Sequence, residues 1–254
     1  MLATVARMMP DVAKERLIPV YSLVSSVVNT GDSVQCPICW GRFRRFLPAR
    51  GRDNVQCPRC LTSERHRLLM LFLRRHTDLF SKPRKRMLHV APEWYLQKYF
   101  QQIDTIEYLS GDIQSPRAMM RIDITALQFP DASFEVILCS HVLEHVSDDR
   151  AAMRELFRIL KPGGWGILDV PIDWSREESF EDWTITTPAE RTKVFGQADH
   201  VRIYGRNYPD LLRDVGFDVE IDQYEVTPEE MARFGLKPSI DHIWMCRKPT
   251  SVTS

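Results

Sequence analysis

The sequence lacks the features that mark membrane and secreted proteins. No apolar run approaches the roughly 18 residues that a membrane-spanning helix needs. At the N-terminus, Pro10, Asp11, Lys14 and Glu15 interrupt the apolar core that a signal peptide requires. We therefore expect a cytoplasmic protein, whose 254 residues hold one large domain or a domain with a small appendage.

Glycine is missing from the place where nucleotide-binding folds use it. Residues 87–90 (MLHV) predict a strand, and the turn that follows, Ala91-Pro92-Glu93, leads into a helix without any glycine. Neither glycines nor basic side chains gather there to hold a pyrophosphate. This absence argues against a diphosphate cofactor and raises the question of which cofactor needs no phosphate cradle.

Strands and helices alternate from Arg86 to the C-terminus. The expected strands are residues 86–91, 105–112, 119–124, 134–140, 165–171, 217–226 and 241–248, and the expected helices are 93–102, 148–160 and 208–216. This order predicts an α/β fold, a Rossmann-like and mostly parallel sheet with helices on both faces. Ligands of such sheets bind beyond the carboxyl ends of the strands.

Side chains that could bind a nucleoside follow several of these strands. Asp112 ends the second strand, where a carboxylate can accept the two hydroxyl protons of a ribose. Asp123 and Ile124 suit the edge and the face of an adenine ring. S-adenosylmethionine is a nucleoside without phosphates, so it fits a site of this kind. The candidate cofactor-binding residues are His89, Ala91, Pro92, Glu93, Asp112, Asp123, Ile124, Ser140 and His141.

Four of the six cysteines form two C-x2-C pairs, Cys36 with Cys39 and Cys57 with Cys60, separated by seventeen residues. This spacing is typical of a zinc ribbon, in which four thiolates surround one structural Zn²⁺ and the intervening segment forms a hairpin. Two disulfides are the alternative, which the absence of a secretion signal disfavours.

Basic residues are concentrated near these cysteines. Residues 36–86 hold fourteen of the 34 Lys and Arg but only three of the 34 Asp and Glu. In the segment 41–52, arginines alternate with Phe43 and Phe46, a pattern that suits RNA binding or a strand packed in a core. We favour packing and keep RNA as an alternative partner.

Three stretches resemble the class I S-adenosylmethionine-dependent methyltransferases: RIDITALQFP, FPDASFEVILCSHVLEHVSD and ELFRILKPGGWGILDVP. The opening loop departs from the acid-x-Gly-x-Gly pattern of that family. LHVAPE and the later FGQADHVRIYG resemble a bacterial subgroup with an N-terminal zinc ribbon. That resemblance implies O-methylation of a glycan or of a small-metabolite hydroxyl.

Methyl transfer to a hydroxyl requires a base and an aligned acceptor. The candidate catalytic residues are His145, His141, Glu144 and His200, and a structural role for the histidines is the alternative. Glu144 with a histidine could instead bind Mg²⁺. Residues 173–207 are too long for an ordinary connection and predict a lid over the acceptor. Its candidate substrate-binding residues are Trp174, Asp173, Trp183, Arg202 and Tyr204, and a homodimer interface is the alternative.

The expected organisation has four parts: an N-terminal amphipathic helix (1–30), the zinc ribbon (31–62), a connecting helix and linker (63–85), and the methyltransferase domain (86–254). In the first part, Leu17, Val20, Tyr21, Val24 and Val28 recur at helical spacing.

Overall fold

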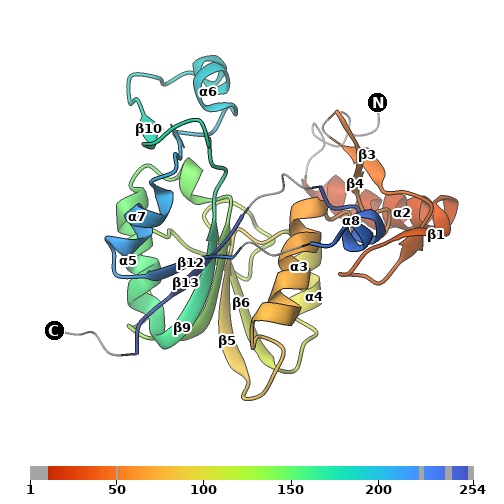
Figure 1. Ribbon diagram of the computed structural model, residues 1–254, viewed down its shortest axis with the longest axis horizontal. Coiled ribbons are helices and arrows are strands. Elements are labelled where there is room, and N and C mark those ends of the chain that lie inside the picture. Colours follow the sequence, from red (N-terminus) through yellow and green to blue (C-terminus); the bar gives the residue numbers. More distant parts are fainter. Residues whose placement is uncertain (1–10, 50, 223–225, 238–241, 251–254) are drawn as a thin grey trace. The chain divides into compact units, whose positions relative to one another are not determined.

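A computed structural model describes residues 11–49, 51–222, 226–237 and 242–250. The chain divides into two compact units, Met1–Thr77 with Glu225–Ile240, and Asp78–Tyr224 with Asp241–Ser254. Figure 1 shows their elements. Within the described ranges, no helix combines the length and apolarity that crossing a membrane requires.

In its described residues, the first unit contains two small hairpins and three helices. Strand β1 (Thr30–Gln35) pairs with β2 (Arg42–Phe43), and β3 (Leu47–Ala49) pairs with β4 (Arg52–Gln56). The cysteine pair 36–39 lies in the turn between β1 and β2, and the pair 57–60 follows β4. The hairpin expected between the cysteine pairs is present as β3–β4, and a second hairpin forms because β2 pairs back onto β1.

Helix α2 (Asp11–Val28) buries a polar face. Ser22, Ser25 and Ser26 are buried, and the Ser22 hydroxyl donates a hydrogen bond to the backbone oxygen of Arg59. The apolar residues that the sequence places at helical spacing are instead exposed: Leu17, Val20, Tyr21, Val24 and Val28.

A buried arginine connects helix α3 (Glu64–His76) to helix α8 (Pro228–Phe234). Arg67 is fully buried, and its guanidinium lies 3.8 Å from the centre of the Phe46 ring. It donates hydrogen bonds of 2.7–3.2 Å to four backbone oxygens, those of Val55, Thr62, Phe234 and Gly235. These bonds explain why the segment around α8 groups with the first unit and not with the methyltransferase domain that was expected to extend from residue 86 to the end.

The second unit is built on a seven-stranded sheet in the order β12-β13-β9-β8-β5-β6-β7. Its strands are β5 (Lys85–Val90), β6 (Ile106–Asp112), β7 (Met120–Arg121), β8 (Phe134–Ser140), β9 (Leu160–Asp169), β12 (Asp218–Asp222) and β13 (Ile243–Arg247). Five neighbouring strands of the sheet run parallel: β9, β8, β5, β6 and β7. Strand β13 pairs antiparallel with both β9 and β12. The predicted fold class is confirmed.

Helices cover both faces of this sheet (Figure 1). Helix α4 (Trp94–Phe100) lies on one face, and α5 (Asp149–Ile159) and α7 (Tyr208–Arg213) lie on the other. Successive strand residues point to opposite faces. Leu88 and Val90 accordingly join the core that contains Met153 and Leu156 of α5.

The connection after β9 forms an extension of the second unit beyond the sheet (Figure 1). It contains β10 (Phe180–Glu181), α6 (Pro188–Phe195) and β11 (Arg202–Ile203), and β10 pairs antiparallel with β11. Helix α6 begins with a capping box between Thr187 and Glu190 and ends at Gly196, whose φ of 84° favours glycine. The expected insertion 173–207 is thus an ordered substructure.

Replacing Arg67 by methionine should lower the free energy of unfolding of the first unit by about 3 kcal/mol, because four buried carbonyls lose their donor. Urea denaturation measures this change. Arg45 is exposed, so Arg45→Met is the matched control and should change the stability by less than about 0.5 kcal/mol. Equal effects of the two substitutions would contradict the anchoring role of Arg67.

Candidate functional site

A cleft of about 680 Å³ lies at the carboxyl ends of β5, β6 and β8, where parallel sheets bind their ligands. Its wall combines apolar side chains with acids and two imidazoles. The lining residues are Val90, Ala91, Asp112, Ile113, Gln114, Ile122, Asp123, Ile124, Thr125, His141, Val142, His145, Val146, Ser147, Asp148 and Asp199.

The opening turn after β5 brings backbone close to the cleft without a glycine. Ala91 adopts a left-handed conformation with a φ of 46°, and its N–H donates to the Gly111 carbonyl at 2.8 Å. Its methyl group is the smallest side chain other than glycine's hydrogen. Alanine therefore lets a ligand approach the backbone of this turn closely, although the left-handed conformation is strained.

Four of the expected cofactor-binding residues do not line the cleft. His89 of β5 is buried against Phe100 of helix α4. Its Nδ1 lies 3.0 Å from the Tyr108 hydroxyl and its Nε2 3.7 Å from a Glu93 carboxylate oxygen. Burial also raises the pKa of Tyr108, so its hydroxyl stays protonated. The others outside the lining are Pro92, Glu93 and Ser140.

Asp112 and Asp123 lie on the cleft wall with one carboxylate oxygen each in a turn. Asp112 Oδ1 accepts hydrogen bonds of 2.7 Å from the backbone N–H of Gln114 and of Ser115. Asp123 Oδ1 accepts from the hydroxyl and the backbone N–H of Thr125, and these bonds lower the pKa of Asp123. Both turns fix the carboxylates and keep Oδ2 available for a ligand.

The loop after β8 carries the imidazoles. His141 has a φ of 56°, and its Nδ1 lies 3.4 Å from Oε1 of Glu144, which is 1% exposed. The loop continues into a short 3₁₀ helix, η1 (Leu143–His145), and both His141 and His145 line the cleft. His145 packs edge-on against His200, with ring centres 4.7 Å apart. Burial lowers the pKa of His200.

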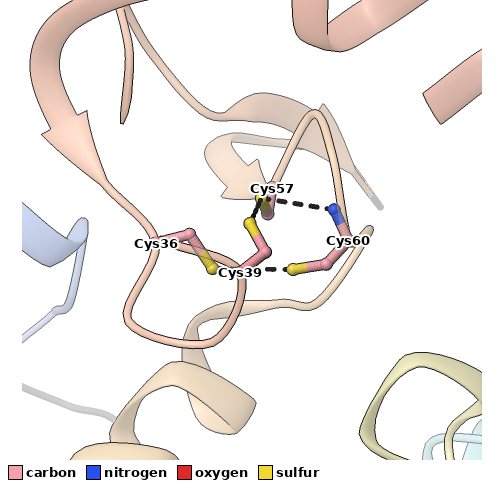
Figure 2. Close-up of side chains that lie close together, drawn as sticks. All are labelled: Cys36, Cys39, Cys57 and Cys60. Carbon is pink, nitrogen blue, oxygen red and sulfur yellow. Dashed lines mark hydrogen bonds between the residues drawn. The ribbon is translucent and has the colours of Figure 1, made fainter. Parts of the chain in front are cut away.

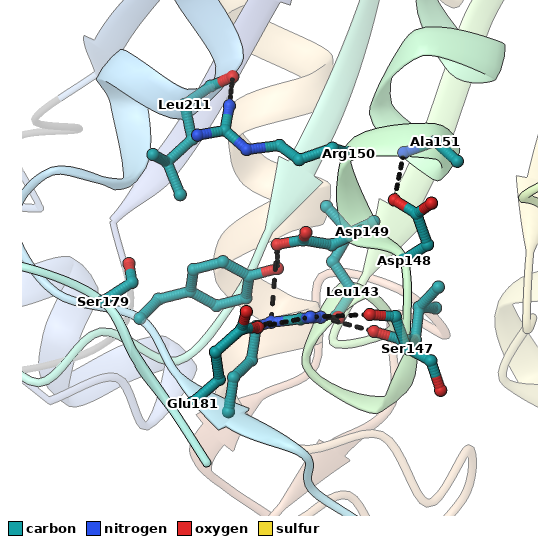
Figure 3. Close-up of polar contacts among 12 residues, drawn as sticks. Leu143, Ser147, Asp148, Asp149, Arg150, Ala151, Ser179, Glu181 and Leu211 are labelled. Carbon is teal, nitrogen blue, oxygen red and sulfur yellow. Dashed lines mark hydrogen bonds and ion pairs between the residues drawn. The ribbon is translucent and has the colours of Figure 1, made fainter. Parts of the chain in front are cut away.

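Arg202 fixes this loop from the extension. Figure 3 shows three of its partners, Leu143 and Ser147 of the loop and Glu181 of the extension. Its guanidinium is 3% exposed and donates to the carbonyls of Leu143 (3.0 Å), Val146 and Ser147 (3.0 Å), and to the Glu181 carboxylate at 2.9 Å. Arg202 does not line the cleft, and its guanidinium bonds to three loop carbonyls and to Glu181, which favours a structural role over the expected role in substrate binding.

The remaining expected substrate-binding residues also lie outside the lining. The Tyr204 hydroxyl donates to Asp149 at 2.6 Å in the buried core. Asp173 accepts hydrogen bonds from Ser175 within its own turn, and Trp174 packs against the His242 ring at 4.5 Å. Trp183 is 53% exposed. The extension thus contacts the loop after β8 through the hydrogen bonds of Arg202. The aromatic residues Trp174 and Trp183, which were expected to bind the acceptor, do not line the cleft.

Sequence reasoning missed Asp199 in the cleft. It lines the wall, and its carboxylate lies 3.4 Å from Nδ1 of His145. The signal available was its position next to His200, in the stretch that the resemblance had already singled out.

The four cysteines of the first unit converge (Figure 2). The Cys36 and Cys60 sulfurs are 3.5 Å apart, and those of Cys39 and Cys57 are 3.6 Å apart. A disulfide would place two sulfurs about 2.05 Å apart. Four thiolates around one zinc ion lie about 3.8 Å apart. All six cysteines are free, so the geometry favours the metal over two disulfides.

The two cysteine turns repeat one another. The N–H of Cys36 donates to the Gly41 carbonyl and that of Cys57 to the Thr62 carbonyl, and Trp40 and Leu61 are both left-handed. Backbone thus holds each pair of sulfurs in the same way.

Part of the second unit is similar in sequence to known methyltransferases. Residues 89–168 match the family model described as a methyltransferase domain. The ubiquinone/menaquinone biosynthesis C-methyltransferase UbiE of Salmonella paratyphi B is 30% identical over 115 residues, 40% of this chain and 45% of that protein. The same enzyme of Salmonella newport matches equally. The chain thus spans less than half the length of the curated relatives it matches.

Among solved structures, a SAM-dependent methyltransferase from Archaeoglobus fulgidus is 16% identical, with 73% of this chain and 95% of that chain covered and a TM-score of 0.48.

Replacing Arg202 by methionine should reduce the free energy of unfolding of the second unit by about 3 kcal/mol, since it breaks a buried network of charge-assisted hydrogen bonds. Thermal and urea denaturation measure the loss. Arg206 pairs with Glu177 at the surface, so Arg206→Met is the control and should cost less than about 1 kcal/mol. A stable Arg202→Met variant would contradict the clamp.

Proposed function

We propose that the chain is a class I S-adenosylmethionine-dependent methyltransferase that binds this cofactor in the cleft and methylates a hydroxyl of a small molecule or glycan. The observation that carries the proposal is the cleft itself: it has fixed carboxylates at the ends of β6 and β7, no phosphate cradle, and imidazoles at its other end.

The described residues fit the nucleoside part of the cofactor. Asp112 Oδ2 is the acceptor proposed for the ribose hydroxyls, held by the turn that occupies Oδ1. Ile124, 5% exposed, and Asp123 offer an apolar face and a polar edge for the adenine. Ala91 permits backbone approach at the opening turn.

The chemistry at the imidazole end is a proton transfer. When bound, the cofactor supplies an electrophilic methyl group on a sulfonium. His141 is the general base that we propose for the acceptor hydroxyl, because it lines the cleft and Glu144 Oε1 orients its Nδ1. A buried carboxylate that stabilises the resulting imidazolium raises the driving force for the transfer.

The acceptor class rests on the resemblance of the opening loop and of the FGQADHVRIYG stretch, and on the cleft wall formed by the extension. The matched relatives carry C-methyltransferase names, so an enol or phenol carbon is the second candidate acceptor. RNA is disfavoured because Phe43 and Phe46 are 1% and 0% exposed and cannot stack on bases.

For the four cysteines we propose a structural Zn²⁺. Four thiolates leave no open coordination position, and a unit with so small a core depends on the metal for folding. Burial lowers the pKa of Arg67, and the nearby thiolates of Cys36 and Cys57 oppose this lowering in part. The charge of Arg67 would thus offset part of the negative charge of a tetrathiolate.

Asp112→Asn tests the ribose assignment. The amide oxygen can still accept the two bonds of the turn, but the amide nitrogen cannot accept a hydroxyl proton. We expect the Kd for S-adenosylhomocysteine to rise at least about tenfold by calorimetry. Asp104 is exposed outside the cleft, so Asp104→Asn should bind like the wild type. Unchanged affinity of Asp112→Asn would remove Asp112 from the site.

A homocysteine-release assay with labelled cofactor tests the function. Label should enter a pool of bacterial sugars and oligosaccharides or of small phenolic metabolites, and not total RNA. Oxygen and carbon acceptors separate in this assay, since an O-methyl group on an aromatic product is lost on acid demethylation. Labelled RNA would overturn the small-molecule proposal.

In the same assay, His141→Ala should lower kcat by about a hundredfold or more, with cofactor affinity unchanged, if His141 is the base. An unchanged kcat would refute the role of this histidine while leaving the acceptor result intact.

A further inference from the structure

Two buried polar atoms beside the cleft have no hydrogen-bond partner within the described part of the chain: Glu144 Oε2 and His200 Nε2. Glu144 is 1% exposed and His200 is 5% exposed. A buried carboxylate oxygen without a partner costs about 1–3 kcal/mol or more. The fold therefore retains two unsatisfied atoms in one place, which calls for a ligand.

The environment of each histidine leaves a ring nitrogen available as a ligand. His200 makes a hydrogen bond to the backbone of Phe195, and because Nε2 has no partner, the nitrogen involved is Nδ1. His145 Nδ1 lies 3.2 Å from the Asp199 carbonyl and 3.4 Å from its carboxylate, which leaves Nε2. A histidine that donates one N–H to a carbonyl or carboxylate and offers the other nitrogen is the usual arrangement of a metal ligand.

These three side chains meet in space. One ligand atom from each of Glu144, His145 and His200 lies within 4.8 Å of the other two. Two ligands on opposite sides of one ion span about 4.2 Å, so small side-chain rotations suffice to close the site. His145, one third exposed, connects this group to the cleft, whereas the other two lie behind it.

The two segments that carry the ligands are held rigidly together. The N–H of Val201 donates to the Glu144 carbonyl at 3.0 Å, and Arg202 bonds to the carbonyls on both sides of it. The ligands are therefore preorganised by backbone contacts and not by the metal alone.

We propose that Glu144, His145 and His200 bind one divalent transition-metal ion at the wall of the cleft. Two imidazoles with one carboxylate suit Zn²⁺, Mn²⁺, Fe²⁺ or Co²⁺ and leave coordination positions open. Mg²⁺ prefers an all-oxygen set, so the magnesium alternative considered from the sequence does not fit these donors. Metal binding is independent of the proposed function. Its consequence rests on that function, since an ion here would bind the acceptor oxygen and lower the pKa of its proton.

Cobalt titration of the zinc-loaded full-length protein tests the site in the absence of cofactor and acceptor. The cysteine site would show intense thiolate-to-cobalt charge-transfer bands, whereas a site of two imidazoles and a carboxylate shows only weak visible bands. We expect one equivalent of Co²⁺ to bind in addition to the zinc, with the weak spectrum, and to be removed by a chelator before the zinc. Uptake at the thiolate site alone would overturn the proposal.

Substitutions assign the ligands. His145→Ala removes a partly exposed side chain and should weaken the Kd for Co²⁺ at least about tenfold, and Glu144→Gln, which preserves shape, should do the same. His242→Ala is the control, a partly buried histidine of the second unit whose ring packs against Trp174, and it should leave metal affinity within about threefold. Wild-type affinity in both His145→Ala and Glu144→Gln would contradict the assignment.

Thermal denaturation with Mn²⁺ is a second readout. An ion that binds only the folded protein raises Tm by mass action, so saturating Mn²⁺ should stabilise the wild type and His242→Ala but not Glu144→Gln. Because neither measurement uses methyl transfer, metal binding without activity would support the site and count against the proposed function alone.

Discussion

The buried guanidinium of Arg202 holds together two segments that lie more than fifty residues apart in sequence, the loop after β8 and the extension after β9. Its guanidinium donates hydrogen bonds to carbonyls of this loop, which would otherwise be buried without a hydrogen-bond donor. The positions of Glu144 and His145 relative to His200 follow from this clamp, and so does the wall of the cleft near Asp199. Both the proposed proton transfer and the proposed metal site depend on it.

The opening turn shows how a nucleotide-binding architecture works without glycine. Ala91 takes the left-handed conformation that glycine takes most easily, and its N–H bonds to the Gly111 carbonyl of the neighbouring strand. His89 does not reach the cleft, because successive residues of a strand point to opposite faces and the next residue, Val90, lines the cleft. The His89 ring instead forms a hydrogen bond with the Tyr108 hydroxyl. In the proposed cofactor complex, no acid at that position would meet the methionine end, and recognition of the nucleoside would depend on Asp112 and Asp123.

Much of the second unit follows from local pattern. The strand 134–140 and the helix that begins at Asp149 are read directly from a buried apolar run and a capped amphipathic segment, and both are confirmed. The expected strand 217–226 is described only as far as Asp222, and its remainder lies in part outside the described residues. The positions of Asp112 and Asp123 on the cleft wall also follow from sequence, because the carboxyl ends of parallel strands meet at one edge.

What failed depends on contacts between distant residues. The spacing of residues in the sequence does not predict that Arg67 donates a hydrogen bond to the Gly235 carbonyl. It also does not predict that Arg202 and Tyr204 are buried in a hydrogen-bond network. For the same reason, the sequence suggested only that Glu144 could bind a metal together with a histidine. The position of His200 beside Glu144 and His145 depends on the tertiary packing of its segment.

The central claim is that a nucleoside without phosphates occupies the cleft between Asp112 and His141. A crystal structure of the protein with S-adenosylhomocysteine tests it most directly. The account predicts the ribose hydroxyls on the Asp112 carboxylate, the adenine against Ile124, and the sulfur facing His141. Adenosine bound elsewhere, or density that leaves Asp112 without a ribose contact, would contradict it.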